Sequence, residues 1–299
     1  MQKIKNLATL LLFSIVFTSC GEYQKVLNKG SIEEQYKMAV KMYETKKYGK
    51  ALRLFEKVTP AYRGKPQMER VQFMVAQSNF NEKNYPMAGY YFDRFTNNYP
   101  KSSKREEAAF LSAYSYKLAS PVSSKDPTDT SKALEAFQGF INTYPTSSKI
   151  EEANNHYKEL RYKLQKKYFD IAKVYYTTSD YDLRNYKAAI QAFDNLLSDY
   201  LGSEFKEEAL YYRLKAAHDF VFKSTDRRRS ERIKDAIEAF EKLERNYPES
   251  QYMEDSKEML SNLKEEQIRV DKLLAEVLRL EKEQEEKKAK KGKDNSKEK

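Results

Sequence analysis

The side chains that most often bind metals or carry catalysis are scarce in this chain. It has one cysteine, Cys20, and two histidines, His156 and His218, which lie far apart in the sequence. A single cysteine cannot form an internal disulfide or a thiolate metal cage. Neither histidine has the i, i+4 partner or the added ligands of a helical metal site. Because no Ser/His/Asp, Cys/His or paired-carboxylate constellation stands out either, we expect a protein that is not an enzyme, with no catalytic residue, metal or cofactor.

The cysteine closes an N-terminal targeting segment. Two lysines precede an apolar run from Leu7 to Phe17, which is shorter than the ~20 residues of a membrane-spanning helix. The run leads into Phe-Thr-Ser-Cys, which resembles a bacterial lipobox, although the commoner pattern has Leu in place of Phe17. We therefore expect residues 1–19 to be a lipoprotein signal peptide and Cys20 to be lipidated. An ordinary secretory signal with an incidental cysteine is the alternative.

The residues after the cysteine suggest where such a lipoprotein would go. In the familiar lipoprotein-sorting pattern an aspartate directly after the cysteine favours retention in the inner membrane. This chain has Gly21 at that position, which resembles the pattern of lipoproteins sent to the outer membrane. Residues 20–30 show no sustained hydrophobic period. We interpret them as a lipidated tether that precedes a helix capped by Ser31.

Charge is spread along the chain rather than gathered in one place. The net charge is +10, but Lys and Arg are interleaved with Asp and Glu. That pattern is typical of solvated helix faces, so we expect no nucleic-acid partner. The basic triplet that follows Asp226 is interpreted as a solvated loop between two helices, with contact to an acidic partner as the alternative.

The rest of the chain is organised around a repeated pattern. In each copy a phenylalanine follows an alanine by four residues, and a tyrosine follows the phenylalanine by seven. The alanine and the phenylalanine share one helix face, so the small side chain admits a neighbouring helix and the large one fills the space beside it. In four copies a serine stands three residues after the tyrosine, and we expect it to cap the next helix. The five copies begin at Ala51, Ala88, Ala133, Ala189 and Ala236.

Three of the copies also have a proline twelve residues after the alanine, which resembles the second helix of a tetratricopeptide repeat. The chain departs from that repeat in having no Trp and a wider spacing than the usual ~34 residues. The resemblance implies an all-α fold, a right-handed superhelical solenoid of about five helix hairpins plus a C-terminal capping helix. We expect a repeat domain over 31–280 and a charged disordered tail over 281–299. The expected repeats are 31–62, 66–99, 103–144, 148–200 and 203–247, followed by the capping helix at 250–280.

The lipobox cysteine, the short tether and the repeats with their Tyr-Pro-x-Ser restart together resemble the BamD family of the β-barrel assembly machinery. Most of the likeness lies in CGEYQKVLNKGSIEEQYKMAVKMYETKKYGKALRLFEKV and YYFDRFTNNYPKSSKREEAAF. The resemblance implies a lipid-anchored protein of the outer membrane that faces the periplasm. It also implies binding to the barrel-forming subunit BamA through the periplasmic domains of that subunit. The N-terminal repeats would receive the C-terminal targeting strand of unfolded barrel proteins.

First helices line the groove of such an array, so we name five of their residues as candidate substrate contacts. For the tyrosines among them core packing is the alternative. Two other functions stay open: a periplasmic tetratricopeptide adaptor of another envelope complex, and a glycan-binding outer-membrane lipoprotein, which the absence of Trp disfavours. The five candidates are Tyr36, Tyr43, Gln72, Asn79 and Tyr114.

Overall fold

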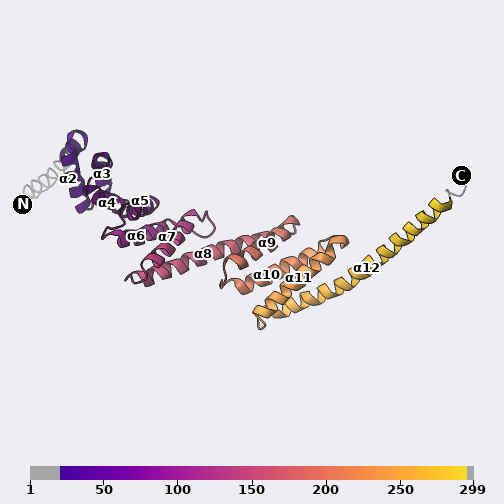
Figure 1. The fold of residues 1–299 in the computed structure, drawn as a ribbon. Helices are drawn as coiled ribbons and strands as arrows, with labels where there is room; N and C mark the ends of the chain where they lie inside the picture. The colour runs from indigo at the N-terminus through magenta and orange to yellow at the C-terminus, as the bar shows by residue number, and fades with distance from the viewer. Residues whose placement is uncertain (1–20, 295–299) are drawn as a thin grey trace, which may run out of the picture. The chain divides into compact units, whose positions relative to one another are not determined.

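The computed structural model describes residues 21–294, and within that range every regular element is a helix (Figure 1). Cys20 and the signal segment lie outside the described residues. Successive helices pack against one another in chain order within each unit, so the prediction of an all-α array of helix hairpins is confirmed. No helix in the described range is both long and apolar enough to cross a membrane.

The chain divides into two compact units at Arg161 and Tyr162, and α8 runs through that boundary. The first unit contains a helical segment at residues 21–29, and then α2 (Ile32–Glu44), α3 (Tyr48–Tyr62), α4 (Gln67–Asn81), α5 (Tyr85–Asn98), α6 (Arg105–Ala119), α7 (Thr128–Thr143) and the start of α8 (Ile150–Thr177). The second unit contains the rest of α8, α9 (Arg184–Asp199), α10 (Lys206–Phe222), α11 (Asp226–Asn246) and α12 (Met253–Asp294).

The repeated alanine and phenylalanine form the core, as their spacing requires. All five alanines have no exposed surface, and the phenylalanines that follow them are at most 3% exposed. Ring contacts extend this core from one helix to the next. In the second repeat, for example, the Phe73 ring of α4 meets Phe92 and Phe95 of α5 edge-on at centroid distances of 5.8 and 5.3 Å.

The restart serines act differently from the expected helix caps. Ser147 Oγ accepts from the backbone N–H of Lys149, ahead of the helix, and donates to Glu106 Oε1 at 2.6 Å. Ser250 does the same with the N–H of Tyr252 and with Glu207 Oε1. The serine therefore closes the turn and ties it to the first helix of the preceding repeat. At the start of the first repeat, Ser31 and Glu34 form the expected cap as a reciprocal capping box.

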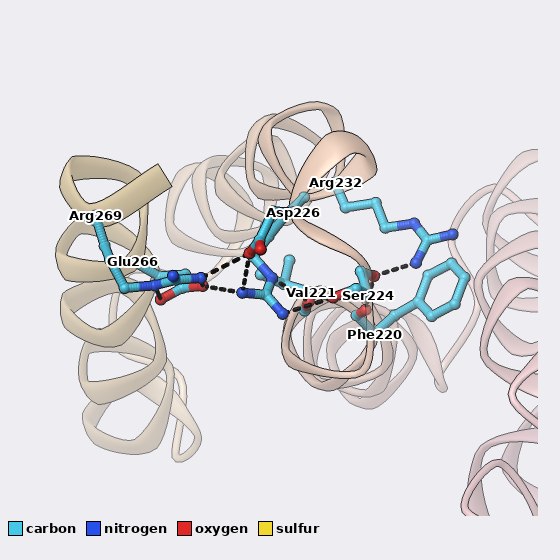
Figure 2. A network of polar contacts seen from close by, with 8 residues as sticks. Phe220, Val221, Ser224, Asp226, Arg232, Glu266 and Arg269 are labelled. Atoms are coloured by element: carbon cyan, nitrogen blue, oxygen red, sulfur yellow. Dashed lines mark hydrogen bonds and ion pairs between the residues drawn. The ribbon is translucent and has the colours of Figure 1, made fainter. Parts of the chain in front are cut away.

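Two further segments differ from expectation in the second unit. The residues from Asp226 onward are the first turns of α11 rather than a loop. Arg229 there pairs with Asp226 at 2.8 Å and with Glu266 of α12 at 2.7 Å. Arg269 pairs with the same two carboxylates, as Figure 2 shows. These ion pairs join the first turns of α11 to α12.

The expected disordered tail at 281–299 also differs, because α12 continues as a helix through Asp294. Its residues are strong helix formers, and Arg279 and Glu283 form an i, i+4 pair at 3.8 Å. Just before this stretch, Val277, Leu278 and Leu280 of α12 are exposed.

Candidate binding groove in the N-terminal repeats

A groove of about 730 Å³ lies between the first two repeats, in the first unit. Its walls are the second helices α3 and α5, and its floor is one face of α4. We call it the α4 groove. It is lined by Leu52, Arg53, Glu56, Thr59, Pro60, Arg63, Gly64, Met68, Gln72, Val75, Asn79, Met87, Tyr91, Arg94, Asn98 and Tyr99.

Helical spacing decides which part of α4 faces this groove. Gln72, Val75 and Asn79 lie at i, i+3 and i+7, so they share one face of the helix. Phe73 and Met74 lie on the other side of α4 and line a different hollow. Two of the five expected contacts, Gln72 and Asn79, therefore come together in the α4 groove.

Gln72 and Asn79 differ in their hydrogen bonds and in how accessible their side-chain amides are. Asn79 is 6% exposed, donates to the carbonyl of Val75 at 2.9 Å and accepts from Asn84 at 3.2 Å, so it is held as part of the floor. Gln72 Oε1 accepts from Asn98 Nδ2 at 3.1 Å, which ties α4 to α5 across the groove. Of the two, Gln72 is the more accessible to a bound segment.

The chemistry of the groove combines apolar surface with positive charge. Leu52, Met68, Val75, Met87 and Tyr91 supply the apolar part, and methionine adapts its shape to different partners. The lining also contains three arginines and one acid, Glu56. Such a lining suits an extended polypeptide segment that has apolar side chains and a carboxylate, because guanidinium binds carboxylate with paired hydrogen bonds. The three arginines are Arg53, Arg63 and Arg94.

The equivalent groove one repeat further along is smaller, at about 490 Å³. Adding 37 to the numbers of Leu52 and Asn79 gives Gly89 and Tyr116, which occupy the matching places there. In the first groove the large apolar side chain of this pair, Leu52, is on the wall. In the second groove the large side chain, Tyr116, is on the floor, and its ring lies against Gly89. Opposite charges also balance in this second groove, which is lined by Arg105 and Lys132 together with Asp93 and Glu135. Only the first of the two grooves combines greater room with excess positive charge.

The three expected tyrosines lie away from the α4 groove and away from one another. Tyr43 lines the hollow on the other side of α4, of about 410 Å³, and donates to Gln77 Oε1 at 3.0 Å. Tyr36 packs against Tyr62 of α3, with ring centroids 5.0 Å apart. Tyr114 packs among aromatic rings of the third repeat and is a partly buried member of its core. The structure does not bring the five candidates into one site.

Sequence reasoning missed the groove residues on the second helices. Met87, Tyr91, Arg94 and Asn98 follow the i, i+4, i+7, i+11 spacing of one helix face, directly beside the core face marked by Ala88. That stripe was readable in the sequence. It was passed over because first helices alone were expected to line a binding surface.

One half-buried histidine, His156, lies elsewhere in the first unit, between α6 and α8. Lys117 Nζ donates to His156 Nδ1 at 2.9 Å, and the imidazole stacks on Tyr114 with centroids 5.3 Å apart. Burial lowers the pKa of His156, and the charge of Lys117 lowers it further. Within residues 21–294 no group of three or more His, Cys, Asp or Glu side chains could hold a metal ion.

Fold and groove together define an α-helical repeat protein whose hairpins resemble tetratricopeptide repeats. The model of the YfiO family, described as outer membrane lipoprotein, matches residues 28–229 and 179–277. The chain therefore belongs to this BamD-like family of outer-membrane lipoproteins.

A relative from Aquifex aeolicus (strain VF5), named "Putative outer membrane protein assembly factor BamD", is 32% identical over 246 residues. The match covers 80% of this chain and 76% of the relative. A solved structure, the DHF58 filament, is 15% identical and covers 91% of this chain and 99% of its own. Its TM-score of 0.16 is too low to support any argument about fold or function.

Proposed function

We propose that this protein is a non-enzymatic scaffold and substrate-receiving subunit of the machinery that assembles outer-membrane β-barrel proteins. It is anchored in the outer membrane through lipid on Cys20 and faces the periplasm. The family match and the name of the Aquifex relative support the general role in outer-membrane protein assembly. A BamA-like barrel subunit is the expected stable partner, and unfolded barrel proteins are the expected substrates.

The α4 groove is the observation that carries the receiving role. The C-terminal strand of an unfolded barrel protein has alternating apolar side chains and ends in the carboxylate of the chain, and the groove offers an apolar floor beside Arg53, Arg63 and Arg94. The groove lies in the first two repeats, where the family resemblance expects substrate to bind. Its volume of about 730 Å³ accommodates several side chains.

Site-specific photocrosslinking tests this role with a matched control. A photoreactive residue replaces Met87 in one variant and Lys132 in the other; the two positions are equivalent, 45 residues apart on α5 and α7. We expect urea-unfolded barrel protein to crosslink several-fold more at position 87 than at position 132. Equal yields at both positions would remove the α4 groove from the proposal.

The stable partner and the anchor are tested separately. Affinity purification of the full chain from membranes should bring down a BamA-like subunit, and its consistent absence would favour an adaptor of another envelope complex. Cys20→Ala should move the protein from the membrane fraction to the soluble periplasmic fraction. A mutant that stays in the membrane would show that lipid on Cys20 is not the anchor.

A further inference from the structure

The stretch expected to be a lipidated tether, 20–30, contains a helix that packs on the first repeat. Residues 21–29 are helical, and Tyr23 and Leu27 are 5% and 9% exposed within the core of the first repeat. The hydroxyl of Tyr23 donates to the carbonyl of Lys50 at 3.2 Å. Buried aromatic and aliphatic side chains with a satisfied hydroxyl are typical of packed structure rather than of a linker. The repeat domain therefore begins directly after Cys20.

Three contacts give the direction of this helix. Gln35 Nε2 donates to the carbonyls of Val26 and Leu27, both at 3.3 Å, and Lys41 pairs with Glu22 at 3.6 Å. As the residue number falls along the segment, the number of its partner on α2 rises. The segment therefore runs antiparallel to α2.

Gly30 makes the reversal between these two helices possible. A Cβ on Gly30 would lie 2.6 Å from the carbonyl oxygen of Val26, closer than real Cβ contacts come. The N–H of Gly30 donates to that same oxygen at 2.9 Å, which closes the end of the segment. The tight approach closes the turn between the segment and α2.

This direction sets where the anchor leaves the protein. Because Glu22 pairs with Lys41, the described chain starts at Gly21 beside the end of α2, where the turn to α3 begins. In the sequence Cys20 directly precedes Gly21, so lipid on that cysteine would attach within one residue of this turn. The opposite end of this hairpin lies about 20 Å away along α3, which has 15 residues at about 1.5 Å each.

The turn next to the anchor is basic. Lys46, Lys47 and Lys50 are exposed, and among the described residues no carboxylate forms an ion pair with any of them. Two acids lie nearby: Glu44 is paired with Arg70 at 3.8 Å, and Glu82 accepts from the backbone N–H of Gly49 at 2.9 Å. Lysine clusters beside a lipid anchor are attracted to anionic headgroups.

We propose that this turn, residues 45–50, lies on the membrane surface and contacts anionic lipid headgroups, so that the docked helix fixes the orientation of the first repeat on the bilayer. The proposal rests on the lipidation of Cys20 proposed above. It gives the anchor a second role, because a rigid connection holds the α4 groove at a set height above the membrane. A flexible tether would leave that height free.

Fluorescence quenching in vesicles tests the contact. The full-length lipidated protein receives a single labelled cysteine in Lys46→Cys or, as the control at the opposite end of the hairpin, in Lys65→Cys. The vesicles contain phosphatidylglycerol and a headgroup-spin-labelled lipid. We expect quenching at position 46 to be at least threefold stronger than at position 65. Equal quenching at both positions would overturn the proposal.

Two further variants separate the effect of the docked helix from the effect of the lysines. Twelve Gly/Ser residues inserted between Cys20 and Gly21 should lower quenching at position 46 toward the value at position 65, since the docked helix then no longer sets the orientation. Lys47→Gln with Lys50→Gln should weaken quenching on phosphatidylglycerol vesicles, and no change would overturn the headgroup contact. Protein that fails to float with vesicles would indicate failure of the anchor itself, which is a different result from failure of the contact.

Discussion

The Tyr116 ring lies so close to Gly89 that a Cβ built on the glycine would be 2.8 Å from the ring. The hydroxyl of Ser112, also on α6, donates to the carbonyl of Gly89 at 2.9 Å. Here α5 and α6 approach closely because one has no side chain where the other has a ring. The same place in the preceding repeat has Leu52 and Asn79, and there the α4 groove is open. One exchange of large and small residues thus distinguishes two grooves built on the same pattern.

Gly89→Ala should destabilise the first unit. Replacing a helical glycine by alanine normally stabilises by about 1 kcal/mol, but overpacking against a ring costs about 1–3 kcal/mol. We expect a net loss of about 1 kcal/mol in the free energy of unfolding, measured by urea titration. Gly139→Ala is the matched control, because a Cβ on that helical glycine meets nothing within 4 Å and should stabilise. Equal effects of the two substitutions would contradict the close approach.

Stability should fall in mild acid because of His156. Its pKa is lowered in the folded protein by burial and by Lys117, so the unfolded chain takes up a proton at a higher pH than the folded one does. The stabilising contribution of the neutral ring is complete above the unfolded pKa of about 6.5 and is lost as the pH drops below it. We expect a lower Tm at pH 5.8 than at pH 7.5, and a smaller difference in His156→Gln. The prediction fails if both proteins lose the same Tm over this range.

The Arg229 cluster should hold α12 against α10 and α11 in the second unit. The guanidinium of Arg229, 15% exposed at its side chain, donates to the carbonyls of Val221 and Ser224 at the end of α10 and pairs with Glu266. Removing it leaves those carbonyls without these donors, at a cost of about 1–3 kcal/mol. We expect Arg229→Ala to raise amide hydrogen exchange where α10 meets α11 and α12.

Arg279→Ala provides the control for that measurement. Its partner lies 3.8 Å away and both side chains are more than half exposed, so we expect a change within about 0.5 kcal/mol. Similar exchange in both variants would mean that the Arg229 cluster does not hold the helices together.

Several features of this protein follow from its sequence alone. The spacing of alanine, phenylalanine and tyrosine is a local property of one helix, and it predicts the hairpins and their buried faces from Ala51 to Phe240. The start of a helix is local as well, which is why the cap at Ser31 was predicted. The combination of repeats with a lipobox-like cysteine pointed to the family that the chain belongs to.

Tertiary packing decided the rest, because it depends on residues far apart in the chain. Which face of α4 opens into a groove depends on how α3 and α5 flank it, and that separated Gln72 from Tyr43. Residues 21–29 are too short and too polar to show a period, yet Tyr23 finds a place in a core made by other helices. Periodicity in a sequence identifies which residues of an element are buried. The space between elements is set by pairs such as Gly89 and Tyr116, which only the folded chain brings together.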